Sequence, residues 1–141
     1  MTDIGLKAFA IRTTDKLRYA DTDRQGHVNN AVFATFLETG RVEVIYGEEL
    51  ADEGAAFVIA RLELDFLAEV NWPGEVEIGT AVHEIGRSSF KLFQQVFQNG
   101  KPVARAVTVI VQMNEATRKS HPLTARARAR LEQLVRPALS T

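Results

Sequence analysis

Cysteine is absent from the sequence. Its absence excludes a disulfide framework, a thiolate metal site and a cysteine nucleophile. Long apolar runs are missing as well, since none approaches the roughly 18 residues that a membrane-spanning helix needs. Residues 1–15 carry acidic side chains and lack the apolar core of a signal peptide. We therefore expect a cytoplasmic protein that neither spans a membrane nor is anchored in one.

Excess charge of either sign is also absent. The 17 lysine and arginine residues nearly balance the 18 acidic residues, which gives a net charge of −1. Without a global positive field, neither nucleic acid nor an anionic membrane is an expected partner, and an anionic ligand must be bound by local groups. The apolar fraction of 45% and the charged fraction of 25% are typical of globular proteins. A chain of 141 residues can bury one core, so we expect a single domain over residues 1–141.

Hydrophobic spacing predicts a long helix in the first third of the chain. An apolar stripe with helical period is formed by Phe33, Phe36, Leu37, Gly40 and Val44. The polar stretch before this stripe includes Asn29 and Asn30, either of which is a candidate N-cap, and Gly47 can end the helix after Tyr46. Since Gly40 lies on the stripe, we expect the helix to approach a sheet closely.

Alternating apolar and polar residues predict five strands. The first covers residues 9–19, and its predicted inward residues are Phe9, Ile11, Leu17 and Tyr19. The other four follow the helix, at residues 60–66, 75–85, 89–98 and 101–113. Asn99-Gly100 is the clearest turn between them, because both residues tolerate the positive φ of a two-residue hairpin.

This order of elements predicts an α+β fold. The four later strands can form a meander, and Thr124 is expected to cap a short C-terminal helix that runs to residue 135. One long helix can cover only one face of a five-stranded sheet, yet the strands are apolar enough for burial on both faces. The uncovered face therefore favours a partner subunit.

The densest cluster of reactive side chains lies on the polar loop before the long helix. It consists of Asp21, Asp23, His27, Asn29 and Asn30. A helix N-terminus offers unpaired N–H groups and the positive end of the helix dipole, so it can stabilise an oxyanion. An aspartate beside it can attack a carbonyl carbon or activate a water. Thioester hydrolysis needs these two parts.

Other interpretations use the same residues. A calcium loop beginning at Asp21 would need a bidentate glutamate at its twelfth position, where this chain has Val32, so that interpretation fails. The spacing of Asp21, Asp23 and His27 matches no recognised metal site, and we expect neither a metal nor another cofactor. Both aspartates can instead bond loop amides or cap the helix, a structural role that the sequence leaves open.

The loop and the helix together carry a longer pattern. Residues 18–30 read RYADTDRQGHVNN, and Phe36-Leu37-Glu38 and Arg41 follow. This pattern resembles the signature of hotdog-fold acyl-CoA thioesterases of the 4-hydroxybenzoyl-CoA thioesterase group. The likeness extends over residues 14–123, because the predicted helix and turns fall in the family's order. It implies a hotdog fold, in which a five-stranded antiparallel sheet wraps around one long central helix, with a short C-terminal helix added.

The resemblance also implies roles for the loop residues. Asp23 corresponds to the family's catalytic carboxylate, and a backbone N–H near Asn30 would polarise the thioester carbonyl. His27 would orient Asp23 or a water, unless it only bonds the loop backbone. Asn29 is a candidate substrate-binding residue.

A second group of residues is expected to hold the CoA moiety. The turn with Arg87, Ser88 and Ser89 would do so, often across a dimer. Subunits of this family pair edge to edge with their active sites at the interface, so we expect a homodimer with shared sites and a homotetramer built from it. Glu38 and Arg41 are three residues apart on the helix and are expected to form a surface or interface ion pair.

The resemblance implies an acyl-CoA thioesterase that releases a free carboxylic acid and CoA. Residues 26–30 differ from their counterpart in the enzyme that names the group, so an aryl substrate is not implied. Two alternatives remain open. One is a non-catalytic acyl-CoA binding module. The other is a hydratase or dehydratase, for which Asp23 with His27 would be the candidate acid–base pair.

Overall fold

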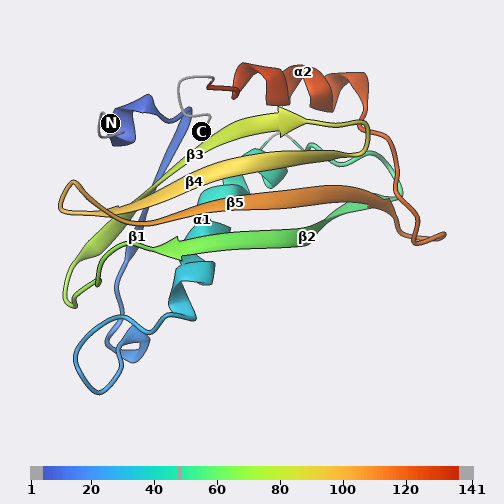
Figure 1. Ribbon diagram of the computed structural model, residues 1–141. Helices are drawn as coiled ribbons and strands as arrows, with labels where there is room; N and C mark the ends of the chain where they lie inside the picture. The colour runs from blue at the N-terminus through green and yellow to red at the C-terminus, as the bar shows by residue number, and fades with distance from the viewer. Residues whose placement is uncertain (1–4, 48, 137–141) are drawn as a thin grey trace.

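The computed structural model describes residues 5–47 and 49–136. A long helix lies against one face of a curved five-stranded antiparallel sheet, and a shorter helix lies at one end (Figure 1). The helices are α1 (Val32–Tyr46) and α2 (Ala125–Gln133), with short 3-10 turns η1 (Leu6–Ala8) and η2 (Tyr19–Asp21). The strands are β1 (Ile11–Lys16), β2 (Ala55–Phe66), β3 (Glu75–Ile85), β4 (Ser89–Gln98) and β5 (Lys101–Asn114). The predicted α+β class is confirmed.

The strand order in the sheet is β1-β3-β4-β5-β2. β3, β4 and β5 form a meander, but the prediction that β2 belongs to it is wrong. β2 pairs with β5 at the far edge, and residues 67–74 then carry the chain back to β3. That connection is tied to the loop before α1, because Val28 N–H donates to the Val70 carbonyl at 2.8 Å. The crossing brings the connection next to the N-terminal end of α1.

Strand lengths differ from the predictions at two places. β2 begins at Ala55 rather than residue 60, because a register shift between Ile59 and Arg61 interrupts the alternation that identifies a strand. β1 covers Ile11–Lys16 rather than residues 9–19, and Tyr19 lies on η2, where it is 75% exposed and packs edge-on against Trp72. The inward position predicted for Tyr19 is therefore wrong.

The apolar stripe of α1 packs against the sheet as predicted, and all of its residues are buried. A Cβ placed on Gly40 would lie 2.7 Å from both Gln94 Nε2 and Ile78 Cγ2. Gln94 Nε2 uses this proximity to donate to the Leu37 carbonyl at 3.0 Å. At Gly40 the backbone of the helix therefore packs directly against side chains of the sheet, which confirms the expected close approach.

The start of α1 differs from the prediction. Its N-cap is Ala31, which makes no side-chain hydrogen bond, and neither Asn29 nor Asn30 occupies that position. Instead, Asn29 Oδ1 accepts from Ala31 N–H at 3.0 Å, one residue before the helix begins. The asparagine closes a turn locally because its short side chain reaches the N–H two residues on.

Much of the outer sheet face is covered by the chain itself. Phe9 stacks on Phe93 and meets Phe97 edge-on, which buries all three rings. Among the described residues, five exposed large apolar side chains lie along α1 and the edge strand β2, namely Val42, Tyr46, Ile59, Leu62 and Phe66. The other three are Tyr19 on η2 and Leu67 and Trp72 on the connection between β2 and β3. None of the helices within the described residues is long and apolar enough to cross a membrane.

α2 begins with the predicted cap, since Thr124 Oγ1 accepts from Ala127 N–H at 3.0 Å. It ends at Gln133 rather than residue 135. The reason is that Val82 N–H of β3 donates to the Leu134 carbonyl at 3.0 Å, which pulls the chain into extended pairing with the sheet. α2 thereby closes one end of the core.

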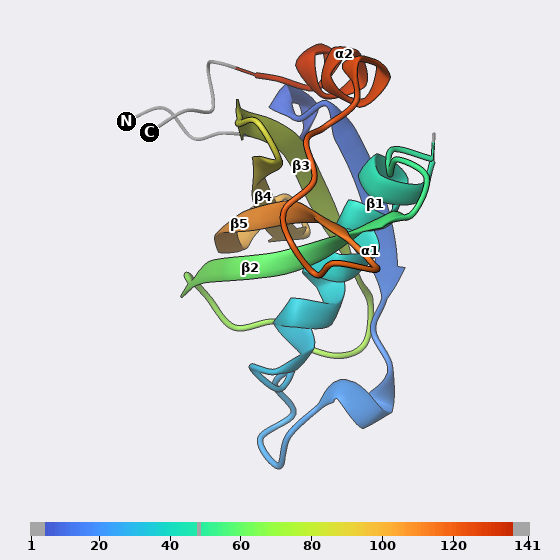
Figure 2. The same ribbon diagram turned by 90° about the vertical axis from the view of Figure 1, so that its right-hand side faces the viewer.

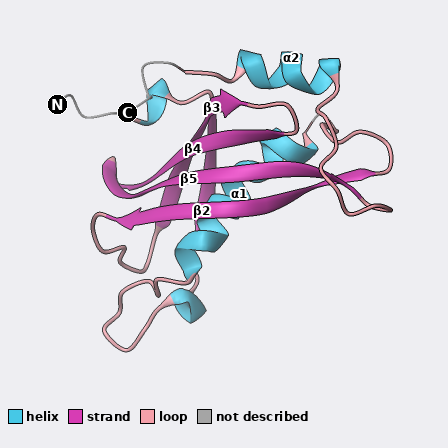
Figure 3. Cartoon of the chain, turned by 45° about the vertical axis from the view of Figure 1, so that its right-hand side comes forward, coloured by secondary structure: helices cyan, strands magenta, loops and turns pink. Residues whose placement is uncertain are grey.

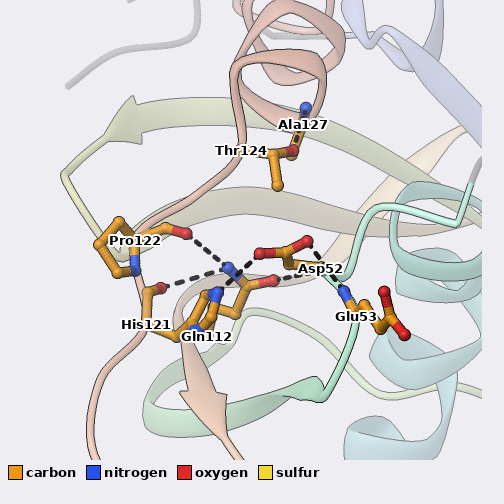
Figure 4. A network of polar contacts seen from close by, with 7 residues as sticks. All are labelled: Asp52, Glu53, Gln112, His121, Pro122, Thr124 and Ala127. Carbon is orange, nitrogen blue, oxygen red and sulfur yellow. Dashed lines mark hydrogen bonds and ion pairs between the residues drawn. The ribbon is translucent and has the colours of Figure 1, made fainter.

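A polar network joins the chain between α1 and β2 to the chain between β5 and α2 (Figure 4). The buried Gln112 side chain accepts from Asp52 N–H at 2.8 Å. It donates to the carbonyls of His121 and Pro122 at 3.2 and 2.9 Å. His121 Nε2 lies 2.7 Å from Asp52 Oδ2. The network holds the segment between β5 and α2 against the segment between α1 and β2.

This network predicts a pH-dependent stability. The contact with His121, and secondly the N–H of Glu53, lower the pKa of Asp52 below its usual 3.8. The ionised carboxylate therefore stabilises the fold above about pH 4, and this contribution is lost as the pH falls through the lowered pKa. We expect the urea midpoint of Asp52→Asn to lie below that of the wild type near pH 7 and the gap to shrink near pH 3. Asp65→Asn changes an exposed carboxylate, and its difference in urea midpoint from the wild type should not vary with pH in this way. A difference for Asp52→Asn that does not depend on pH would contradict the stabilising role of the ionised Asp52.

Candidate active site

The loop between β1 and α1 is a folded hairpin that projects beyond the N-terminal end of α1 (Figure 3). Thr22 and Val28 form an antiparallel bridge, and Asp23 N–H donates to the His27 carbonyl at 2.8 Å. Gly26 has a φ of 78°, the left-handed conformation that the turn requires and that glycine adopts without strain. These contacts hold the side chains of the loop at defined positions.

Asp21 has a structural role. It is 3% exposed, and its carboxylate accepts from Arg18 N–H and from an Arg18 guanidinium nitrogen, both at 2.9 Å. The hydrogen bond and charge of Asp21 raise the pKa of Arg18. The Asp21 carbonyl also accepts from Asn29 N–H at 2.8 Å. The structural interpretation of the acidic pair therefore applies to Asp21.

Asp23 is placed differently, because its side chain is exposed and lines a cleft. Its Oδ1 accepts from Gln25 N–H at 2.8 Å and from His27 N–H at 3.2 Å. Within the described residues, Oδ2 has no hydrogen-bond donor. One oxygen is thus fixed by backbone amides, while the other is available to a ligand or a water.

The cleft has a volume of about 360 Å³, within the range of small-molecule sites. Asn30 lines it together with Asp23, at the point where α1 begins. The Asn30 N–H has no acceptor in the part of the chain that the structure describes, whereas Val32 and Phe33 donate to the carbonyls of Asn29 and Asn30. Two residues that line one cleft therefore each carry a polar group without a partner among the described residues, Oδ2 of Asp23 and the N–H of Asn30.

His27 also lines the cleft, and its ring has a partner there. His27 Nε2 lies 3.1 Å from Glu69 Oε2, on the connection between β2 and β3. The His27 backbone pairs with Asn71 and with Asp23, so both its ring and its backbone are engaged. No sequence motif identifies Glu69 as a residue of the cleft. It lies beside His27 only because residues 67–74 cross back to β3 at this end of the sheet.

The apolar wall of the cleft is formed by Phe33 of α1 and Phe66 of β2, whose rings meet edge-on at a centroid distance of 5.2 Å. Phe66 is half exposed, so this wall can contact a ligand. Asn29 does not line the cleft. Its side chain holds Ala31 and its N–H binds Asp21, which makes it a residue that shapes the loop.

Arg87, Ser88 and Ser89 lie at the turn between β3 and β4, at the opposite end of the sheet from the cleft. β3 separates the two ends, and at about 3.3 Å per residue its length is roughly 35 Å. The Arg87 carbonyl accepts from Leu123 N–H and the Ser88 carbonyl from Gln112 N–H, while Arg87 itself is exposed. A single chain therefore does not bring this turn to Asp23.

Glu38 and Arg41 form no ion pair within residues 5–47 and 49–136, and Arg41 is buried, so their predicted pairing inside one helix is not present. The described residues contain no group of three histidine or acidic side chains that could hold a metal ion. Of the residues predicted for the site, Asp23, His27 and Asn30 line the cleft.

The sequence matches the thioesterase-like superfamily over residues 17–131. It is similar to the acyl-CoA thioesterase YbgC of Helicobacter pylori, with 27% identity over 84 residues, which are 58% of this chain and 63% of that relative. The match thus spans less than two thirds of the relative's length. A thioesterase from Thermus thermophilus, crystallised with coenzyme A and Zn, is 33% identical, with a TM-score of 0.81 over 91% of this chain and 96% of that one.

The fold is matched by further solved structures. The PA5185 protein of Pseudomonas aeruginosa superposes with a TM-score of 0.84 over 97% of this chain and 98% of that one, at 20% identity. At this identity the likeness concerns the fold alone. With the thioesterase structures it confirms the predicted hotdog architecture, a sheet wrapped around one central helix.

The different placement of the two aspartates predicts different effects on stability. Asp21→Asn removes a buried charged acceptor, so we expect it to lower the free energy of unfolding by about 1–2 kcal/mol. Asp23→Asn changes an exposed side chain and should alter it by less than about 0.5 kcal/mol. Urea denaturation followed by circular dichroism measures both. Equal losses for the two variants would refute this division of roles.

Proposed function

The chain belongs to the thioesterase-like superfamily, a family of hydrolases, and we propose that it cleaves an acyl-CoA thioester into a free carboxylic acid and CoA. The observation that carries this proposal is the shared cleft, which is lined by Asp23 and Asn30. Among the described residues, Asp23 Oδ2 has no donor and Asn30 N–H has no acceptor. Two similar proteins support the choice of substrate. One is named an acyl-CoA thioesterase, and the other was crystallised with coenzyme A.

In the proposed reaction the thioester carbonyl oxygen accepts a hydrogen bond from Asn30 N–H. The positive end of the α1 dipole stabilises the negative charge that this oxygen gains as the carbonyl carbon becomes tetrahedral. Asp23 either takes a proton from a water that attacks the carbon or attacks the carbon itself. Collapse of the tetrahedral species breaks the carbon–sulfur bond, and the CoA thiolate leaves and takes up a proton. If Asp23 attacks directly, water then hydrolyses the resulting anhydride.

The neighbours of Asp23 support these roles. The amides of Gln25 and His27 hold Oδ1, which fixes the orientation of the carboxylate, and the second oxygen has no donor among the described residues. Phe33 and Phe66 offer an apolar wall for the acyl group. His27, paired with Glu69, is positioned to orient a water or the substrate. No metal or other cofactor is part of the proposal.

A complete site is proposed to need two copies of the chain. Arg87, Ser88 and Ser89 are too distant from Asp23 to hold a CoA molecule whose thioester reaches the same chain's cleft. A second subunit would supply this turn, with Arg87 contacting a phosphate of CoA. The proposed assembly is a dimer with shared sites, and a tetramer formed from two such dimers. The proposed location is the cytoplasm, in keeping with a chain that lacks cysteine.

Replacement of the proposed base should remove most of the activity. We expect Asp23→Asn to lower kcat by about 10²- to 10⁴-fold, because a neutral amide neither accepts the proton nor attacks the carbonyl. Release of free thiol from short, medium, long and aromatic acyl-CoA thioesters measures this. Asp65→Asn, an exposed carboxylate outside the cleft, serves as the control. Equal rates for Asp23→Asn and the wild type would remove Asp23 from its role, and binding of acyl-CoA without turnover by the wild type would favour a binding module.

The CoA-binding turn makes a separate prediction. Arg87→Ala should raise KM for acyl-CoA by about 10- to 100-fold with little change in kcat, because it removes a charged contact remote from the reacting bond. The same variant should leave KM unchanged for an acyl-pantetheine thioester, which lacks the nucleotide phosphates. Arg12→Ala, at an exposed arginine of β1, is the control. A KM effect of equal size on both substrates would contradict a phosphate contact.

A further inference from the structure

The turn between β3 and β4, residues 86–89, is held in place by the C-terminal part of the chain. We call it the Arg87 turn. We propose that Gln112 and Arg128 are positioning residues for CoA, because they hold this turn in the conformation that binds a phosphate of the nucleotide. The inference rests on the proposed function, in which the turn contacts CoA, and it adds two residues from other elements.

Three carbonyls of the Arg87 turn accept hydrogen bonds from the C-terminal part of the chain. The pairs are Arg128 Nη2 with Gly86, Leu123 N–H with Arg87, and Gln112 N–H with Ser88, at 2.9, 2.9 and 2.7 Å. The donors lie on β5, on α2 and on the segment between them, which runs along this end of the sheet to α2 (Figure 2). The conformation of the turn therefore depends on a part of the chain that is distant in sequence.

The fourth carbonyl of the turn is engaged as well. The Ser89 carbonyl accepts from Gly86 N–H at 2.7 Å, and a Cβ placed on Gly86 would lie 3.0 Å from Ser89 Oγ. The turn is therefore closed between its first and last residues. All of its carbonyls are bound within the chain.

The N–H groups of the turn remain available to a ligand. Those of Arg87 and Ser88 have no acceptor among the described residues, and the Arg87 side chain is exposed. Successive backbone N–H groups and an arginine are donors with which proteins bind phosphate. Because its carbonyls are bound elsewhere, the turn offers donors rather than acceptors to an anion.

Gln112 holds the segment that supplies these donors (Figure 4). Its side chain is buried, and the amide donates to the carbonyls of His121 and Pro122 at 3.2 and 2.9 Å. Leu123, whose N–H holds the Arg87 carbonyl, follows directly in the chain. One buried side chain therefore fixes the backbone N–H that holds the middle of the turn, next to the bond that its own N–H makes.

Arg128 holds the start of the turn from α2. Its side chain is partly exposed, and its backbone N–H donates to the Thr124 carbonyl in the first turn of the helix. The hydrogen bond from its guanidinium to the Gly86 carbonyl therefore joins an ordered helix to the turn. Hydrogen bonds from a charged donor are stronger than those between neutral groups, so this contact restrains the turn effectively.

The test measures the affinity of the whole 141-residue chain for CoA itself by isothermal titration calorimetry. Gln112→Met keeps the length of the side chain and removes its three hydrogen bonds, and Arg128→Met removes the bond to Gly86. We expect each variant to raise the Kd for CoA by about 10-fold, as the loss of the net contribution of a hydrogen bond would. The KM for an acyl-pantetheine thioester, which lacks the nucleotide phosphates, should not change.

A double-mutant cycle with Arg87→Ala separates positioning from direct contact. If Arg128 acts through the turn, Arg128→Met should raise the Kd by only about 3-fold or less once the Arg87 side chain is absent, because coupled effects are not additive. Gln112→Met should behave in the same way. Effects that multiply fully with that of Arg87→Ala would overturn the positioning roles.

Two control variants account for lost charge and lost stability. Arg136→Met removes an arginine that also donates to main-chain carbonyls, at 3.0 and 2.9 Å, but beyond the C-terminal end of α2. Phe97→Leu loosens the buried cluster of rings on the outer sheet face, near the other end of β4. Neither should change the Kd for CoA. If Gln112→Met does not fold, Arg128→Met, at a partly exposed residue, is sufficient for the test.

Failure of the inference and failure of the proposed reaction give different results. Kd values for Gln112→Met and Arg128→Met equal to those of the controls would overturn the positioning roles and leave the hydrolysis proposal standing. A wild type without measurable affinity for CoA would refute the inference, whereas thiol release would still test the role of Asp23. Equal turnover by Asp23→Asn and the wild type would refute that role without altering the measured affinities.

Discussion

The fit of α1 against the sheet at Gly40 determines where the functional features of the molecule lie. Because this residue has no side chain, the helix backbone sits close enough for Gln94 to donate to the Leu37 carbonyl. The contact sets the depth and direction of α1. Asn30, just before the N-cap of α1, and Phe33 in its first turn line the cleft. The candidate active site thus lies at the N-terminal end of one positioned helix.

Burial and hydrogen bonding give different environments to the two aspartates of the loop, which are two residues apart. Asp21 is buried and its oxygens are used by Arg18, so it holds the loop. Asp23 is exposed, and two amides orient one of its oxygens while the other has no donor among the described residues. The loop thus leaves one carboxylate oxygen unpaired in a residue that lines the cleft. This arrangement supports the proposed role of Asp23 as a base or nucleophile.

The distance between Arg87 and Asp23 leaves the proposed CoA site incomplete in a single chain. The turn that carries Arg87 and the loop that carries Asp23 are separated by the length of β3, so one chain does not place both against the same CoA molecule. A second subunit that supplies this turn would complete the proposed site.

The sequence alone determined the order of the helices and strands and which polar residues stand on the loop before α1. The stripe from Phe33 to Val44, the hairpin at Asn99-Gly100 and the cap at Thr124 depend on neighbours within a few residues, so local patterns predict them. Tertiary structure alone decided that β2 pairs with β5 and that Glu69 contacts His27. It also decided that Arg41 is buried and forms no ion pair with Glu38 within the described residues. These contacts join residues far apart in the chain or depend on what covers a side chain, and no local pattern contains either.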